Sequence, residues 1–141
     1  MKWKIIPWVF VAALLGVALY AHFARQTQTP HQTQNIACAN LAQGCAFDFR
    51  GQAARIAFSR RPNALEGFTL TVQAPGAKTV DVDFQMPDMD MGENRYVLSQ
   101  VKPGEFSAAN IVLPACAHGG VEWVANLRID DARYTLPFTV R

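Results

Sequence analysis

The sequence predicts an all-β protein, an antiparallel sandwich of seven or eight strands preceded by one N-terminal transmembrane helix. Three observations lead to this prediction. Apolar and polar residues alternate repeatedly after residue 45, and turn signals recur every 8–12 residues. An uncharged apolar run occupies residues 5–23. A chain of 141 residues has room for one core of this kind, in a domain of roughly 100 residues.

The N-terminal run, IIPWVFVAALLGVALYAHF, has the length of a membrane-spanning helix. Its nineteen residues, 5–23, would rise roughly 28 Å as a helix, about the thickness of a hydrocarbon core. Lys2 and Lys4 outweigh Arg25, so the positive-inside rule keeps the N-terminus in the cytoplasm. Residues 1–25 are therefore predicted to be a signal-anchor in a bacterial inner membrane, with the following domain in the periplasm. A cleaved signal peptide is the alternative, although the small-residue cleavage pattern is poor.

A polar linker is expected over residues 26–44, which include Cys38 and His31. Residues 24–35, ARQTQTPHQTQN, bury no face and are typical of a tether. A solvated histidine is the simpler interpretation of His31, and an accessory metal ligand is the other. The β-sandwich domain is then expected over residues 45–141.

The strands follow one another with clear turn signals between them. The expected strands are 46–50, 53–59, 67–73, 79–86, 95–101, 105–113, 121–130 and a last one carrying Tyr134, Leu136, Phe138 and Val140. Gly51-Gln52 is a hairpin signal between the first two. Strands of this number and spacing favour a sandwich of immunoglobulin-like or cupredoxin-like type.

Strand direction predicts which connections share an end of the domain. If each strand reverses the preceding one, the loops 60–65, 87–93 and 114–120 lie at the same end as Cys45 and Cys38. This places the methionines of the 87–93 loop beside Cys116 and His118.

Charge and motif content exclude two classes of function. Three of the thirteen basic residues and none of the eleven acidic ones lie in the first 25 residues, so the remainder carries a formal charge of −1. This excludes the basic surface that nucleic-acid binding requires. The domain holds one histidine and no hydrolase, phosphate-loop or zinc-protease motif, which argues against an enzyme. Asp81 and Asp83 alternate on a strand and are expected to face solvent.

The run Met86-Pro87-Asp88-Met89-Asp90-Met91-Gly92 is the feature that predicts chemistry. Thioethers are soft, neutral ligands that prefer Cu(I) and tolerate an oxidising compartment. Met89 and Met91 are the main candidate ligands because acidic residues and glycine around them indicate an exposed turn. Met86 continues the inward face of its strand, so a core role competes with ligation. Calcium binding through Asp88, Asp90 and Glu93 lacks the EF-hand spacing.

Cys116 and His118 are candidates for the remaining ligands, because residues two apart in an extended segment can face one site. A blue-copper centre is excluded, since it needs two histidines and the domain has one. The competing interpretation is a disulfide-bonded Cys116 and a solvated His118. Cys38 and Cys45 enclose a short loop and are the preferred disulfide pair, while pairing of either with Cys116 stays open.

The chain resembles the YtkA-like and FixH-like group of small membrane-anchored bacterial β-sandwich proteins in four features. They are the anchor, the run Asp-Phe-Gln-Met-Pro-Asp-Met-Asp-Met-Gly, then Leu-Pro-Ala-Cys, and then Glu-Trp. The resemblance covers about residues 65–141 and implies a role in copper handling or in assembly of copper-dependent respiratory oxidases. We therefore expect a Cu(I) carrier whose partner is a membrane-bound oxidase subunit or another copper carrier. The alternatives are a metal-free module that docks a membrane-bound partner through a methionine-rich surface, and, less favoured, a thiol-redox protein.

Overall fold

The structure is a computed structural model of the chain, and it describes residues 13–17, 19–20, 33–87, 89, 92–115 and 121–140. The chain divides into two compact units, residues 1–30 and residues 31–141. In the first unit, residues 13–17 and 19–20 are helical. Within the described part of the chain, no helix combines the length and the apolar character needed to cross a bilayer. The predicted span 5–23 lies largely outside the described residues, so it stays a prediction.

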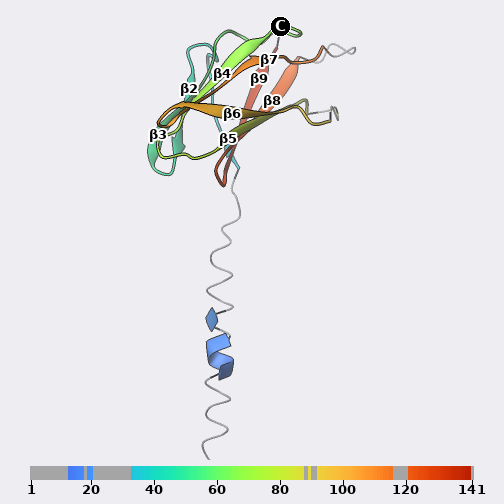
Figure 1. Cartoon of the computed structure of the whole chain (residues 1–141). Coiled ribbons are helices and arrows are strands. Elements are labelled where there is room, and N and C mark those ends of the chain that lie inside the picture. The colour runs from blue at the N-terminus through green and yellow to red at the C-terminus, as the bar shows by residue number, and fades with distance from the viewer. Residues whose placement is uncertain are drawn as a thin grey trace, which may run out of the picture. The chain divides into compact units, whose positions relative to one another are not determined.

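The second unit is built from nine strands (Figure 1). They are β1 (Gln34–Asn35), β2 (Cys45–Phe49), β3 (Gln52–Phe58), β4 (Phe68–Gln73), β5 (Val80–Gln85), β6 (Arg95–Lys102), β7 (Glu105–Ile111), β8 (Glu122–Ile129) and β9 (Ala132–Thr139). Strands β2 to β9 confirm the eight segments that alternation predicts, with ends that shift by one or two residues. The unit is therefore all-β, as predicted.

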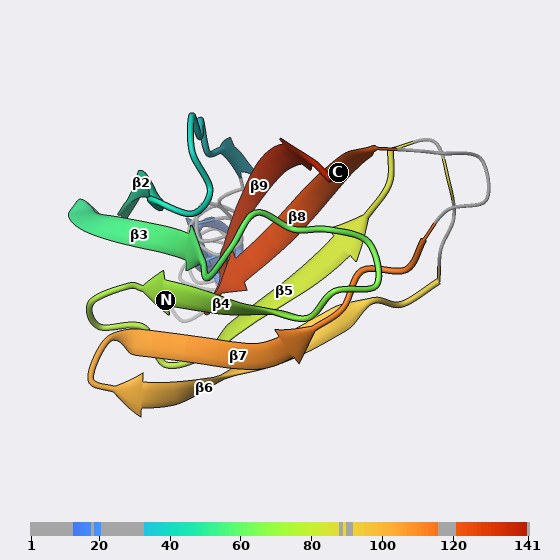
Figure 2. The ribbon, with the colours of Figure 1, turned by 90° about the horizontal axis from the view of Figure 1, so that it is seen from above.

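One curled sheet contains all nine strands, in the order β1-β9-β8-β5-β6-β7-β4-β3-β2 (Figure 2). The curl centres on β6, whose residues 95–98 pair with β5 and whose residues 99–102 pair with β7. The ladder shifts register between Gln100 and Lys102, as at a β-bulge. One strand thus belongs to both halves of a sandwich-like body.

The prediction of a wholly antiparallel sheet is wrong at one edge. β1 is a ninth strand and runs parallel to β9, with Gln34 opposite Tyr134 and Asn35 opposite Thr135. The two residues of β1 are polar and show no alternation, so pattern cannot find them. Ile36, which follows them, is 3% exposed and belongs to the core. Residues 33–44 of the predicted linker are therefore part of the folded unit.

The core lies between the two halves of the curled sheet and follows the alternation of the sequence. On β5, Val80, Val82 and Phe84 point inward, while Asp81 and Asp83 lie on the outer face. On β8 and β9 the inward residues are Trp123, Ala125, Leu127, Ile129, Tyr134, Leu136 and Phe138. Burial of this apolar face, at roughly 25 cal/mol per Å², is the main source of stability.

Two hairpin turns are tied together by charge. Arg50 and Gly51 both have positive φ, 53° and 77°, as a type I′ turn between β2 and β3 requires. The Arg50 guanidinium forms ion pairs with Asp130 at 3.3 Å and with Asp131 at 2.7 Å, in the β8–β9 turn. Asp130 Oδ1 also accepts hydrogen bonds from the backbone N–H groups of Lys78 and Thr79, each at 2.9 Å.

Replacement of Asp130 by asparagine is expected to destabilise the fold by roughly 1–3 kcal/mol at pH 7. Burial raises the pKa of Asp130, but the hydrogen bonds from Thr79 and Lys78 and the charge of Arg50 outweigh it, so the net pKa is lowered. Because the pKa of Asp130 is lower in the folded than in the unfolded state, the ionised carboxylate stabilises the fold fully above the ordinary aspartate pKa. This stabilisation is lost as the pH falls through the pKa of the folded state. Urea unfolding of the parent and of Asp130→Asn, at pH 7 and at pH 2.5, checks this prediction. An equally large difference in unfolding free energy between the two proteins at pH 2.5 would contradict it.

Candidate functional site

One end of the sheet gathers the connections that carry the predicted ligands. We call it the loop end; it comprises the start of β4, the end of β5, the start of β6, the end of β7 and the start of β8. Phe68 pairs with Ile111 and joins β4 to β7, while the pairs Asp83–Arg95 and Gln85–Val124 join β6 and β8 to β5. A hydrogen bond from β6 to the residue that follows β7 links the two groups. The direction count from the sequence is confirmed for these strands.

Met86 and Met89 have different environments at the loop end. Met86 follows β5, is 7% exposed and belongs to the hydrophobic core. Met89 is 38% exposed, and its N–H donates to the carbonyl of Met86 at 3.3 Å in an isolated bridge. The N–H of Phe84 donates to the carbonyl of Asn94 at 3.0 Å and closes the base of the loop. The loop therefore carries one methionine into the core and presents another at the surface.

The connection from β7 to β8 begins beside this loop. Leu113 is fully buried and its carbonyl accepts a hydrogen bond from the N–H of Leu65 at 2.9 Å, while Pro114 and Ala115 are exposed. The Tyr96 hydroxyl donates to the carbonyl of Val112 at 3.2 Å and joins β6 to the end of β7. The predicted ligands Met91, Cys116 and His118 lie outside the described residues, so their ligation stays a prediction.

Exposed apolar side chains accompany Met89 at the loop end. They are Leu65 at 69% exposure, in the β3–β4 connection, and Val112 at 39% and Val121 at 52%, both in the β7–β8 connection. Leu65 also has a positive φ of 63°, which is uncommon for a bulky residue without glycine's freedom. We call these three residues with Met89 the apolar rim.

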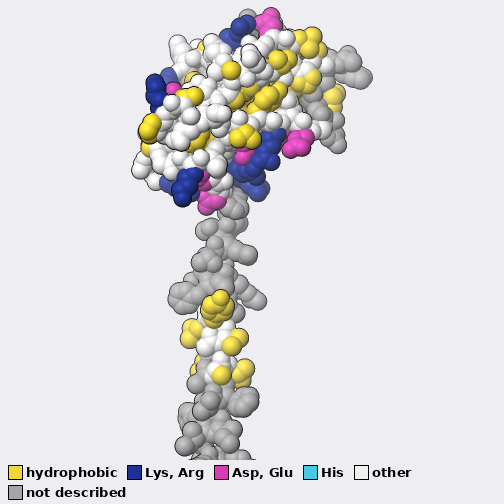
Figure 3. All heavy atoms as spheres, in the orientation of Figure 1, with side chains coloured by type: hydrophobic (Ala, Val, Ile, Leu, Met, Phe, Trp, Pro, Cys, Tyr) yellow, Lys and Arg dark blue, Asp and Glu magenta, His cyan; other side chains and the backbone are white. Residues whose placement is uncertain are grey.

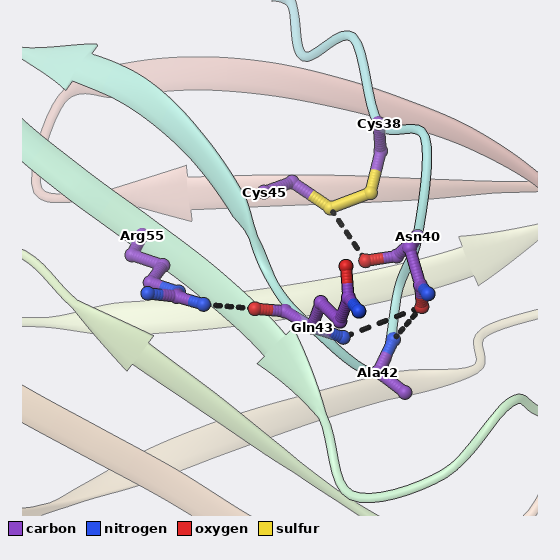
Figure 4. The surroundings of a disulfide bond; sticks show 6 residues. All are labelled: Cys38, Asn40, Ala42, Gln43, Cys45 and Arg55. Atoms are coloured by element: carbon purple, nitrogen blue, oxygen red, sulfur yellow. Dashed lines mark hydrogen bonds between the residues drawn. A yellow bond between two sulfur atoms is a disulfide. The ribbon is translucent and has the colours of Figure 1, made fainter.

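The predicted disulfide between Cys38 and Cys45 is confirmed, with the two Cα atoms 5.2 Å apart (Figure 4). It closes the 38–45 loop onto the start of β2. Inside the loop, the Asn40 side-chain oxygen accepts hydrogen bonds from the N–H groups of Ala42 and Gln43 at 3.1 and 3.3 Å, and Arg55 donates to the Gln43 carbonyl. Cys116 is then the one cysteine of the sequence outside the disulfide.

The expected solvated surface at Asp81 and Asp83 has more order than the sequence suggests. Asp81 forms ion pairs with Arg95 at 3.0 Å and Arg128 at 2.9 Å, and its side chain is 16% exposed. The two arginines are 14 and 47 residues from Asp81 in the sequence, so only the register of the strands identifies them as its partners. Among the described residues, no cluster of three or more His, Cys, Asp or Glu side chains is placed to hold a metal ion.

Comparisons of the chain with protein-family models, with curated proteins and with solved structures found no match.

Proposed function

We propose that this protein is a membrane-tethered periplasmic Cu(I)-binding protein whose ligands include the thioethers of Met89 and Met91. The observation that carries the proposal is the exposure of the Met89 side chain on a loop held at both ends. The Met86–Met89 bridge and the Phe84–Asn94 hydrogen bond fix the loop on the sheet. A thioether presented by an anchored loop needs little ordering to bind a metal.

The chemistry of the neighbouring groups fits a soft ion. Two thioethers prefer Cu(I), and Cys116 or His118 from the β7–β8 connection would complete a low-coordinate site. Cys116 is outside the Cys38–Cys45 disulfide, which favours it as a ligand. We assign Met86 to core packing. The disulfide itself supports residence in an oxidising compartment, where thioethers are durable ligands.

Transfer of copper is the role that we propose for this site, toward a membrane-bound oxidase subunit or another carrier. Thioether ligation is weak enough to release the ion, as a donor requires. The resemblance to the YtkA-like and FixH-like group supports the same role. The strand order, with β3, β4 and β7 in one half and β5, β8 and β9 in the other, supports an immunoglobulin-like sandwich.

A double replacement tests the site: Met89→Leu with Met91→Leu. Cu(I) binding by the full chain, measured without oxygen against a competing chelator, is expected to fall at least tenfold while the unfolding temperature stays within a few degrees. Leucine keeps the apolar volume and removes only the sulfur. Asp88→Asn with Asp90→Asn is the matched control and is expected to leave Cu(I) binding unchanged. Equal Cu(I) uptake by the leucine variant would refute the site.

A metal-free docking function is the second candidate, and the apolar rim favours it. Leu65 combines 69% exposure with positive φ, a combination that neither packing nor solubility explains. This function would make partner capture independent of copper and sensitive to Leu65→Asp. Copper-dependent capture that tolerates Leu65→Asp would exclude it.

A further inference from the structure

The outer face of β9, β8, β5 and β6 contains a hollow of about 450 Å³, on the side of the sheet opposite the core. Thr33 and Glu93 line it together with charged side chains of the strands. Figure 3 shows basic and acidic side chains next to one another on the visible surface of the domain. Met89 does not line this hollow, and the inference drawn from the hollow does not rest on the proposed function.

Two like charges face each other across the β8–β9 ladder in this hollow. Arg128 and Arg133 are directly opposite residues, an arrangement that destabilises a sheet unless an anion compensates it. Asp81 lies opposite Arg128 on the other side and accepts from its Nε at 2.9 Å. Within the described part of the chain, Arg133 has no ion pair, so its guanidinium is available to an anion.

Asp81 orients two guanidinium groups without using their terminal nitrogens. It accepts from Nε of Arg95 at 3.0 Å and from Nε of Arg128, and no other hydrogen bond of either side chain is found among the described residues. The Nη groups of both arginines are therefore available to a ligand. Guanidinium groups held in this way bind phosphate oxygens well, because they offer paired, charged donors.

A carboxylate that lines the hollow, that of Asp83, lies a short distance along the same face. Asp83 Oδ2 accepts from Nε2 of Gln85 at 2.6 Å, but Asp83 Oδ1 is buried and has no hydrogen-bond partner in the described structure. Asp83 is half-buried and lines the hollow, so its carboxylate offers an acceptor to a cationic N–H donor bound there. Asp83 is on the strand next to Arg128 and two residues out of register, so their Cα atoms are about 8 Å apart by sheet geometry.

We infer that this hollow binds a small zwitterion, an ammonium-bearing phosphate ester. Arg128 and Arg133 bind the phosphate, with Arg95 at its side, and the carboxylate of Asp83, which lines the hollow, accepts a hydrogen bond from the ammonium group. A short link between phosphate and ammonium, as in phosphoethanolamine, is expected because Asp83 and Arg128 lie on neighbouring strands. The same chemistry occurs in free phosphate monoesters and in the phosphodiester headgroup of an aminophospholipid.

Calorimetric titration of the full chain, in a non-ionic detergent, with phosphoethanolamine and with phosphocholine tests the inference. Phosphocholine has no N–H donor for Asp83, so phosphoethanolamine is expected to bind at least tenfold more tightly. If the unmutated chain binds the two compounds equally, or binds neither, the inference is overturned. Glycerophosphoethanolamine separates the sources: tighter binding of this diester identifies a lipid headgroup, and tighter binding of the monoester identifies a free metabolite.

Two variants test the two ends separately. Arg133→Gln and Asp83→Asn are each expected to weaken phosphoethanolamine binding at least tenfold, with unfolding temperatures close to that of the parent. Lys102→Gln removes an exposed charge that lies outside the hollow, and it is expected to change nothing. Loss of affinity in Arg133→Gln with full affinity in Asp83→Asn would reduce the site to a simple anion site and overturn the zwitterion assignment.

Discussion

Replacement of Phe84 by alanine is expected to destabilise the domain by about 3–5 kcal/mol. The Phe84 ring is fully buried and lies edge-on to the rings of Phe68, Tyr96 and Phe138, with centroids 5.9, 6.1 and 6.2 Å away. These three rings come from strands on both sides of the core. Alanine would leave a cavity that two halves of one curled sheet cannot both move to fill.

Urea unfolding of the full chain, followed by far-ultraviolet circular dichroism, measures this loss. Val97→Ala is the control, because the Val97 side chain is 75% exposed and its truncation is expected to cost less than about 0.5 kcal/mol. A cost below about 1.5 kcal/mol for Phe84→Ala would mean that the core relaxes around the missing ring, which contradicts a core held rigid between the two halves of the sheet.

Removal of the disulfide by Cys38→Ala with Cys45→Ala is expected to destabilise the domain by about 2.5 kcal/mol, from the chain entropy of the short loop that the bond closes. The two cysteines are seven positions apart, so the unfolded state gains the freedom of that loop. Cys45 is 4% exposed and Cys38 packs against the core, so the loss of buried sulfur adds to the effect. Reduction of the parent chain is expected to produce a similar loss.

Cys116→Ala is the matched control for the disulfide, since Cys116 lies outside it. Its thermal unfolding is expected to match that of the parent, in oxidising and in reducing buffer. A large loss in this variant, combined with stability of the double variant, would show that the chain folds around a different cysteine pairing.

The strands could be predicted because their alternation is strong and their burial is one-sided. Val80, Val82 and Phe84 alternate with Asp81 and Asp83, and a slip of one residue would bury both carboxylates. The Cys38–Cys45 pair was also predictable, from the short loop that it closes. These features depend on neighbours in sequence, which is why pattern finds them.

Contacts between distant segments could not be predicted in the same way. The parallel pairing of β1 with β9 joins residues 100 positions apart, and a two-residue polar strand carries no periodic signal. The Arg95–Asp81–Arg128 cluster depends on the register of three strands. Among the candidate copper ligands, the sequence indicated that Met89 is exposed, but it allowed either core packing or ligation for Met86. The burial of Met86 assigns it to the core.

The parallel strand and the disulfide together determine how the domain would bear a mechanical load. A pull on the chain from its N-terminal side first meets β1 and Ile36, and five residues after Thr33 it reaches Cys38. Because Cys38 is covalently joined to the first residue of β2, tension beyond that point passes into the sheet and bypasses the 39–44 loop. Force can peel away only residues 33–37 before it must break the main ladders, so the domain has a built-in stop against unravelling from the end nearest the apolar segment.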